Sequence, residues 1–492
     1  MDNSNLGSAE SGVQYRKAKL WQIIFLSFNA FNGMAVYFLI GLASYSASIG
    51  YGIATLVVGG LLTFTRIFDA VTDPLLAFLY DRVNTPFGKV RPLLICGWVI
   101  ETLGLLCMFN FFSSKGHGIA VFLLFYMIYV IGYTLVNMTA QTLPALITND
   151  PKQRPTVGVW QTVFNYLIPM VLNILVYSVI MPSMGGSFNQ EFLNVVTWIC
   201  VTMAFVGVVV ECIGVAEYDR PENFEGLEKK ERLKLKDMVN VLMNNRPLQC
   251  YIASNASDKI AQQASAASIV STMINGIIIG NMGLATILSM IGMLPSILFA
   301  IYGAKYAGKH GHMESIVTWS RNCIFANLAI CLFFVITRFT VGTHSISQMG
   351  ITLILYVLLT FVCNGFAMCV TTANTGFMAD VIDYELDRSG KYVPAVVAGT
   401  YSLVDKIISS FSAAIATAAV AIIGYTTTMP QPDDPMTPGV FWMSLSLRYG
   451  LAIIGWLITL IAMKFCKLTR EEMVNVQTRI SEKKEALKQE AL

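Results

Sequence analysis

The nine residues RIFDAVTDP, from Arg66 to Pro74, place three charged side chains inside a long apolar stretch. Arg66, Asp69 and Asp73 are spaced i, i+3 and i+7, so a helix puts all three on one stripe. A charge at the centre of a membrane-spanning helix costs about 2.5–3.5 kcal/mol on insertion scales, so the stripe is expected to face a cavity. Arg66 can neutralise one carboxylate, which leaves the other to bind a small cation or a proton. A structural Arg–Asp bridge is the alternative, but it leaves the second aspartate unexplained.

A second polar stripe lies in the stretch IGYTLVNMTAQTLPALITNDP. Thr134, Asn137 and Gln141 recur there at helical spacing, so this polar face is expected to point inward. Hydrogen bonds between helices, without any ligand, would explain the same pattern. Further along, Asp405 and Lys406 are adjacent and therefore do not face each other on a helix. The lysine can bind sugar hydroxyls, a substrate carboxylate or the aspartates of RIFDAVTDP, and a structural ion pair is the alternative.

These stripes belong to a chain of 492 residues that is 55% hydrophobic and 13% charged, whereas soluble domains carry about 25% charged residues. Apolar runs of about 20 residues are candidate membrane-spanning helices. The sequence predicts an all-α integral membrane protein with twelve transmembrane helices. The expected spans are 20–45, 53–80, 92–113, 118–147, 156–183, 194–217, 248–278, 282–304, 317–337, 349–378, 394–427 and 440–466.

Basic residues gather in alternate connections between these spans. The outer connections hold Lys115 and Arg338, while the inner connections and the tail hold many more. The positive-inside rule therefore predicts cytoplasmic termini in a multi-pass protein of the cell membrane. A charged central connection divides the spans into two halves, as in the repeats of secondary transporters. The predicted parts are a cytoplasmic N-terminus 1–19, a six-helix bundle 20–217, a cytoplasmic loop 218–247, a second six-helix bundle 248–466 and a cytoplasmic tail 467–492.

Other kinds of chemistry find little support in the sequence. All ten cysteines lie in or beside apolar runs without a CxxC pair, so we expect small buried hydrophobes and no disulfides or metal ligands. The four histidines fall in predicted loops, and we find no nucleotide-binding loop or catalytic set. We therefore expect no enzyme, no metal centre and no nucleic-acid partner. The sequence leaves four charged residues without a role: Glu101, Glu211, Asp258 and Lys259.

Four features occur in a characteristic order: RIFDAVTDP, GKVRP from Gly88, MADVIDYE from Met378, and Lys406. Together they resemble the glycoside–pentoside–hexuronide:cation symporters, the melibiose-permease-like branch of the major facilitator superfamily. The resemblance covers essentially the whole transmembrane region, and it implies two pseudo-symmetric six-helix bundles with alternating access. It implies that the coupling cation binds at Asp69, Thr72, Asp73 and Thr134, with Arg66 as charge partner. Thr72 stands where the best-studied members have asparagine, so both Na⁺ and H⁺ stay open as the coupling ion.

The resemblance also implies substrate and gating residues. Amides replace the acids and a tryptophan of the galactoside carriers, so an anionic sugar would be repelled less. The expected sugar ligands are Asn29, Asn32, Asn137, Gln141 and Lys406. GKVRP and MADVIDYE are expected to close the cytoplasmic gate, with topology anchoring as the alternative. The gating residues would be Gly88, Lys89, Arg91, Asp380, Asp383 and Glu385.

The expected function is secondary active symport of a sugar (a glycoside, pentoside or hexuronide) with Na⁺ or H⁺. The expected partners are this sugar, the cation and the lipid bilayer, the protein is expected to be a monomer, and no cofactor besides the coupling ion is expected. A lysolipid transporter of the same fold and a non-transporting sugar sensor are the alternatives. The retained aspartate pair argues against the sensor, because a sensor needs no coupling ion.

Overall fold

The computed structural model describes residues 18–82, 85–113, 116–147, 154–220, 235–390 and 394–490. In these ranges the chain is helical apart from turns, loops and one isolated bridge between Thr85 and Gly88. Ten helical stretches of the described residues are long and apolar enough to cross a membrane, which confirms the all-helical membrane class. They are Leu20–Gly41, Thr55–Asp73, Val90–Phe111, Ile119–Ala140, Val163–Ser183, Gln190–Val215, His312–Thr340, Ile351–Ser389, Gly399–Ile422 and Pro438–Phe465.

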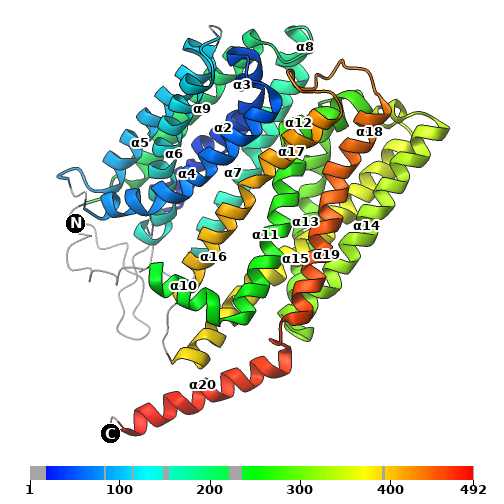
Figure 1. Ribbon diagram of the computed structural model, residues 1–492. Coiled ribbons are helices and arrows are strands. Elements are labelled where there is room, and N and C mark those ends of the chain that lie inside the picture. The colour runs from blue at the N-terminus through cyan, green and yellow to red at the C-terminus, as the bar shows by residue number, and fades with distance from the viewer. Residues whose placement is uncertain are drawn as a thin grey trace. The chain divides into compact units, whose positions relative to one another are not determined.

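The first of two compact units comprises Met1–Lys229 and Gly424–Asp433 (Figure 1). Within it α5 packs along α6, α2 packs on α7 and α9, and α4 packs on α6. Its helices are α1 (Leu20–Ser27), α2 (Asn29–Gly41), α3 (Ala43–Tyr51), α4 (Thr55–Arg82), α5 (Val90–Leu106), η2 (Cys107–Phe111), α6 (Ile119–Ile147), α7 (Arg154–Asn173), η4 (Ile174–Ile180), α8 (Met181–Ser183) and α9 (Gln190–Val215).

The second unit comprises Lys230–Ile423 and Asp434–Leu492. Within it α14 packs along α15, and α11 packs on α16 and α19. Its helices are α10 (Leu235–Asn244), α11 (Arg246–Ala266), α12 (Ser268–Ser271), η6 (Thr272–Ile278), α13 (Leu284–His310), α14 (His312–Thr340), η7 (Thr343–Ser347), α15 (Ile351–Ser389), α16 (Pro394–Ser409), α17 (Phe411–Ile422), α18 (Pro438–Leu445), η8 (Ser446–Gly450), α19 (Leu451–Phe465) and α20 (Arg470–Glu490).

Two of the expected spans, 248–278 and 282–304, are not among the ten. The first is divided between α11 and α12, because Ala267 has an extended backbone with ψ of 138°. In the second, the side chains of residues 285–297 lie outside the described part of α13. The count of twelve membrane helices therefore stays a prediction.

Helices α5 and α6 approach each other at glycines. Gly132 on α6 lies against the backbone of Glu101 on α5, and Gly104 on α5 lies against the backbone of Tyr129 on α6. A side chain at either glycine would collide with main-chain atoms that cannot move aside cheaply. These contacts hold the polar face of α6 in a fixed position beside α5.

The connection before α5 is fixed by Asp219, which follows α9. Its fully buried carboxylate accepts hydrogen bonds from the backbone N–H groups of Lys89, Val90 and Arg91 at 2.8–3.0 Å. The Arg91 Nε also donates to Asp219, at 3.3 Å. An acid at a helix N-terminus satisfies donors that have no partner within the helix. Gly88 has φ of 100° and packs directly against Asp219, so any larger residue there would be strained.

The second unit has a similar arrangement built from different residues. Gly311 has φ of 95°, lies between α13 and α14, and packs against Arg470, which follows α19. The Arg470 guanidinium donates to the Lys309 carbonyl at the end of α13. In each unit a left-handed glycine before a long helix thus contacts the segment that follows the last membrane helix.

Helix α20 runs across the end of the second unit, and polar side chains hold it to α15 (Figure 1). Gln477 donates to Asp383 at 2.7 Å, and Arg479 donates to Asp387 at 2.8 Å. Arg479 also donates to Glu472 at 2.9 Å, and this hydrogen bond lowers the pKa of that carboxyl. Because a lowered carboxyl pKa favours the ionised form, this contact is fully formed at neutral pH and is lost as the pH falls through that pKa.

We expect Asp219→Ala to lower the free energy of unfolding by about 3 kcal/mol, because it strands buried backbone donors beside a guanidinium. The thermal unfolding midpoint of the purified protein in detergent measures this. Glu482→Ala, at an exposed carboxylate of α20, is the control and should unfold like the wild type. Equal midpoints for the two variants would contradict the assigned role of Asp219.

We expect Arg479→Gln to loosen α20, since it removes the donors to Asp387 and Glu472. Backbone amides of residues 470–482 should then exchange with deuterated water several-fold faster, as in other weakly held segments. Lys467→Gln removes an exposed cation just before α20 and should leave the exchange unchanged. Unchanged exchange in Arg479→Gln would show that α20 is held by other contacts.

Candidate functional site

The residues expected to bind a cation come together in the first unit, where α4 packs on α6. Thr134 on α6 donates a hydrogen bond from Oγ1 to Oδ1 of Asp69 on α4, at 3.1 Å. Thr134 is 3% exposed and Asp69 is half-buried. A hydroxyl and a carboxylate that belong to separate membrane helices thus face one another.

The rest of the RIFDAVTDP stripe surrounds this contact. Asp73 is half-buried one turn beyond Asp69 on α4. The Thr72 hydroxyl donates to the carbonyls of Phe68 and Asp69 at 3.1 Å, so its proton is used within its own helix. Its oxygen keeps lone pairs that can still coordinate a cation.

Arg66 lies within electrostatic reach of Asp69, one turn before it. Three tyrosines of α6 also interact with the Arg66 charge: Tyr126, Tyr129 and Tyr133. Their rings follow one another along α6 with centroids 5.5 and 5.8 Å apart. The Arg66 side chain is exposed, and its charge acts both on the first aspartate and on this column of phenols.

Asn32 contacts an acid to which the sequence assigned no role. Its Nδ2 on α2 donates to Oε2 of Glu101 on α5 at 3.3 Å, and both residues are 1% exposed. Among the described residues, Oε1 of Glu101 and Oδ1 of Asn32 have no hydrogen-bond partner. A proton on Glu101 would supply a donor that both oxygens lack. The contact could not be foreseen, because helical periodicity does not show which helices are neighbours.

The other expected sugar ligands are scattered over several helices. Asn29 is half-buried at the start of α2, and Asn137 is exposed on α6, three residues after Thr134. The side chain of Gln141 lies outside the described residues. Sugar binding by these residues stays a prediction.

Asp405 and Lys406 are adjacent on α16 and differ in burial. Asp405 is 9% exposed, and Lys259 on α11 is the cation that acts on it. Lys259 also interacts electrostatically with its neighbour Asp258, so the charge of one lysine acts on two carboxylates. Lys406 is half-buried.

The two expected gating motifs make their described charge contacts within their own units. GKVRP is bound to Asp219, as described above. In MADVIDYE, Asp380 pairs with Nδ1 of His312 at 2.6 Å, and Glu385 accepts from Asn245 at 2.9 Å and from Arg388 at 2.7 Å. These contacts are those of structural anchors, and gate closure stays a prediction.

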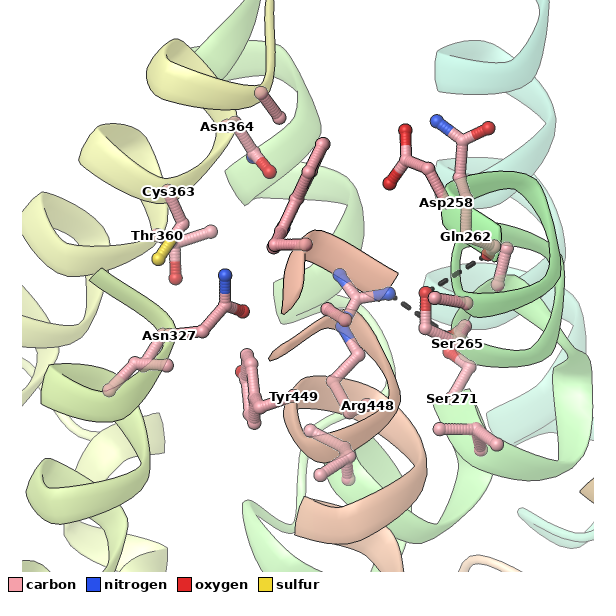
Figure 2. A pocket seen from close by; sticks show the side chains of 18 of the residues that line it. Asp258, Gln262, Ser265, Ser271, Asn327, Thr360, Cys363, Asn364, Arg448 and Tyr449 are labelled. Atoms are coloured by element: carbon pink, nitrogen blue, oxygen red, sulfur yellow. Dashed lines mark hydrogen bonds between the residues drawn. The ribbon is translucent and has the colours of Figure 1, made fainter. Parts of the chain in front are cut away.

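A cavity inside the second unit has no counterpart in the sequence expectations (Figure 2). Its volume is about 410 Å³, and its polar lining includes Gln262, Asn327, Asn364 and Arg448. Arg448 belongs to η8 and donates to the Ser265 carbonyl at 3.0 Å. The sequence signal for this cavity is Arg448 itself, an arginine well inside the apolar run 440–466.

Comparisons with known proteins agree with the sequence motifs. The family model described as MFS/sugar transport protein matches residues 27–470. The putative glycoside/cation symporter YagG of Escherichia coli (strain K12) is 25% identical over 406 residues, which cover 80% of this chain and 81% of that protein. The lactose permease of Lactobacillus helveticus is 22% identical over 460 residues, which cover 87% of this chain and 66% of that protein.

Solved structures support the same fold. The crystal structure of the nucleoside transporter NupG has a TM-score of 0.59 at 13% identity and covers 91% of this chain and 98% of its own. At this identity the likeness shows the fold alone. Since the family model spans nearly the whole chain, the protein belongs to the MFS/sugar transport family of membrane transporters, within the melibiose-permease-like branch that its motifs resemble.

Proposed function

We propose that the protein takes up a sugar together with Na⁺ or H⁺ by alternating access. The family membership and the names of its relatives, a putative glycoside/cation symporter and a lactose permease, support sugar transport. The observation that carries the cation site is the 3.1 Å hydrogen bond from Thr134 to Asp69. It joins the two polar stripes on different membrane helices, and a passive structural Arg–Asp bridge would not require it.

The coupling cation binds beside Asp69 and Asp73. The two carboxylates lie one helical turn apart, and Thr134 fixes the orientation of the first. The positive charge of Arg66 offsets one carboxylate, so the pair need not carry two full negative charges when the cation leaves. Carboxylate and hydroxyl oxygens suit Na⁺, while a proton needs a single carboxylate.

The cation and the sugar are coupled by linkage. If the bound cation raises the affinity for the sugar, the sugar raises the affinity for the cation by the same factor. Both then cross when the bundles rearrange around them. Asn29, Asn137 and Lys406 are proposed to bind sugar hydroxyls. Asn32 is buried and is proposed to act on the sugar site indirectly, through its hydrogen bond to Glu101. The proposed orientation places both termini in the cytoplasm of the cell, with the protein as a monomer.

We expect Asp73→Asn to abolish accumulation of sugar against its gradient, because one negative charge of the cation site is removed. Uptake of radiolabelled glycosides and uronides into proteoliposomes, with a gradient of Na⁺, Li⁺ or H⁺, measures this. Exchange of internal for external sugar without a gradient is the companion assay and should persist. Gradient-driven accumulation at the wild-type level would refute the coupling role.

We expect Thr134→Val to raise the cation concentration for half-maximal uptake at least tenfold, because a hydrogen bond to a charged group contributes about 1.5–3 kcal/mol. The maximal uptake rate at saturating cation should change less. Thr202→Val is the matched control: Thr202 is exposed on α9, and its hydroxyl donates to the Trp198 carbonyl of the same helix. The hydrogen bond would be irrelevant to the cation if both variants had the same cation dependence.

A further inference from the structure

The cavity in the second unit has an unusual cation at its wall. Arg448 is an interior residue of the membrane stretch Pro438–Phe465 and is half-buried. Among the described residues it makes one hydrogen bond, to the Ser265 carbonyl, and no ion pair. A guanidinium has five N–H donors, so most of the Arg448 donors make no hydrogen bond within the described residues. Figure 2 shows the guanidinium between Ser265 on one side and Asn327 on the other.

The backbone around this cavity is irregular at three places. The helical path breaks between α11 and α12 at Ala267, next to the carbonyl that Arg448 caps. η6 and η8 are π-helical segments, and both contribute lining residues. π-Helical turns are rare and occur often at functional sites. Broken helices at membrane depth are tolerated where they line a cavity, and in transporters such breaks form binding sites.

Among the described residues that line the cavity, Arg448 is the cation without an ion-pair partner. Asp258 is the acid of the lining, and the cation that acts on it is Lys259, its neighbour on α11. Tyr356 and Tyr449 line the wall beside Arg448 and interact with its charge. A structural cap for α11 would explain one donated hydrogen bond. It does not explain a cavity of about 410 Å³ in front of the remaining donors.

We propose that this cavity binds a small organic acid, with its carboxylate on Arg448 and its hydroxyls on the amides of Asn327 and Asn364. A planar guanidinium matches a carboxylate with two parallel hydrogen bonds. The volume falls at the lower end of the range for small-molecule sites, which suits a ligand of monosaccharide size. The carboxylate belongs either to a sugar acid, held at a site separate from the residues Asn29, Asn137 and Lys406 of the proposed function, or to another small acid.

Equilibrium dialysis of purified protein in detergent, with radiolabelled D-glucuronate, tests the proposal. The methyl ester of D-glucuronate has nearly the same shape without the charge, and we expect it to compete at least tenfold more weakly. Arg448→Gln should weaken glucuronate binding at least tenfold, and Arg448→Lys should restore part of it. Arg321→Gln, at an exposed arginine of α14 outside the cavity, should bind like the wild type.

Acetate as a second competitor separates the two sources of the carboxylate. Displacement of glucuronate by acetate at similar concentrations indicates a separate small acid, and a much weaker effect of acetate indicates a sugar acid. The dialysis needs no cation gradient, so failure of coupled uptake and failure of binding are distinct results.

If Arg448→Gln does not fold, Asn364→Ala replaces it, because Asn364 is exposed and lies on a different helix. That variant should weaken glucuronate about threefold and leave acetate unchanged. The proposal is wrong if acid and ester bind equally to the wild type, if neither glucuronate nor acetate binds, or if a folded Arg448→Gln binds glucuronate normally.

Discussion

A polar side chain inside an apolar helix gains most from a partner within the surrounding bundle, because neither lipid nor aliphatic side chains can replace water. Glu211 on α9 is an exception, since neither of its buried carboxylate oxygens has a hydrogen-bond partner among the described residues. This constraint explains the internal contacts of both units. Asp69 accepts a hydrogen bond from Thr134, Glu101 is satisfied in part by Asn32, and Arg448 in part by the Ser265 carbonyl. Each pairing joins two different helices, so the costly groups also fix which helix faces lie together. Two of these residues keep polar atoms without a hydrogen bond in the described part of the chain. The other donors of Arg448 lie at the wall of a cavity, and Oε1 of Glu101 lacks a donor within the described ranges.

The sequence placed polar residues on two helical stripes, and the structure brings a residue of each stripe into contact, while cation binding there stays a prediction. Helical spacing placed Arg66, Asp69 and Asp73 on one stripe, and the insertion cost indicated that the stripe faces inward. Thr134 lies on a second polar stripe, and the two stripes contact each other in the structure. This contact was within reach of the sequence because the few polar residues in an apolar bundle have few possible partners.

The rest of the site depends on which helices are neighbours, and periodicity does not contain that information. Asn32 was expected to face a sugar, and Glu101 had no role, because the contact between α2 and α5 leaves no trace in either stretch. Ala267 breaks the seventh expected span without a proline or glycine to mark the break. Arg448 lies in the predominantly apolar run 440–466, and nothing else in that run indicates a cavity beside it. Asp219 lies beyond a span, where an acid is commonly exposed to solvent.

The close contact of Gly132 with the backbone of Glu101 gives the first unit a mechanical property. Gly132 lies on α6 two residues before Thr134, and Glu101 on α5 holds Asn32 of α2. With no side chain to compress at this point, α5 and α6 behave as a stiff pair. The close contact at Gly132 thus places the helix that carries Thr134 directly against the helix that carries Glu101, the partner of Asn32.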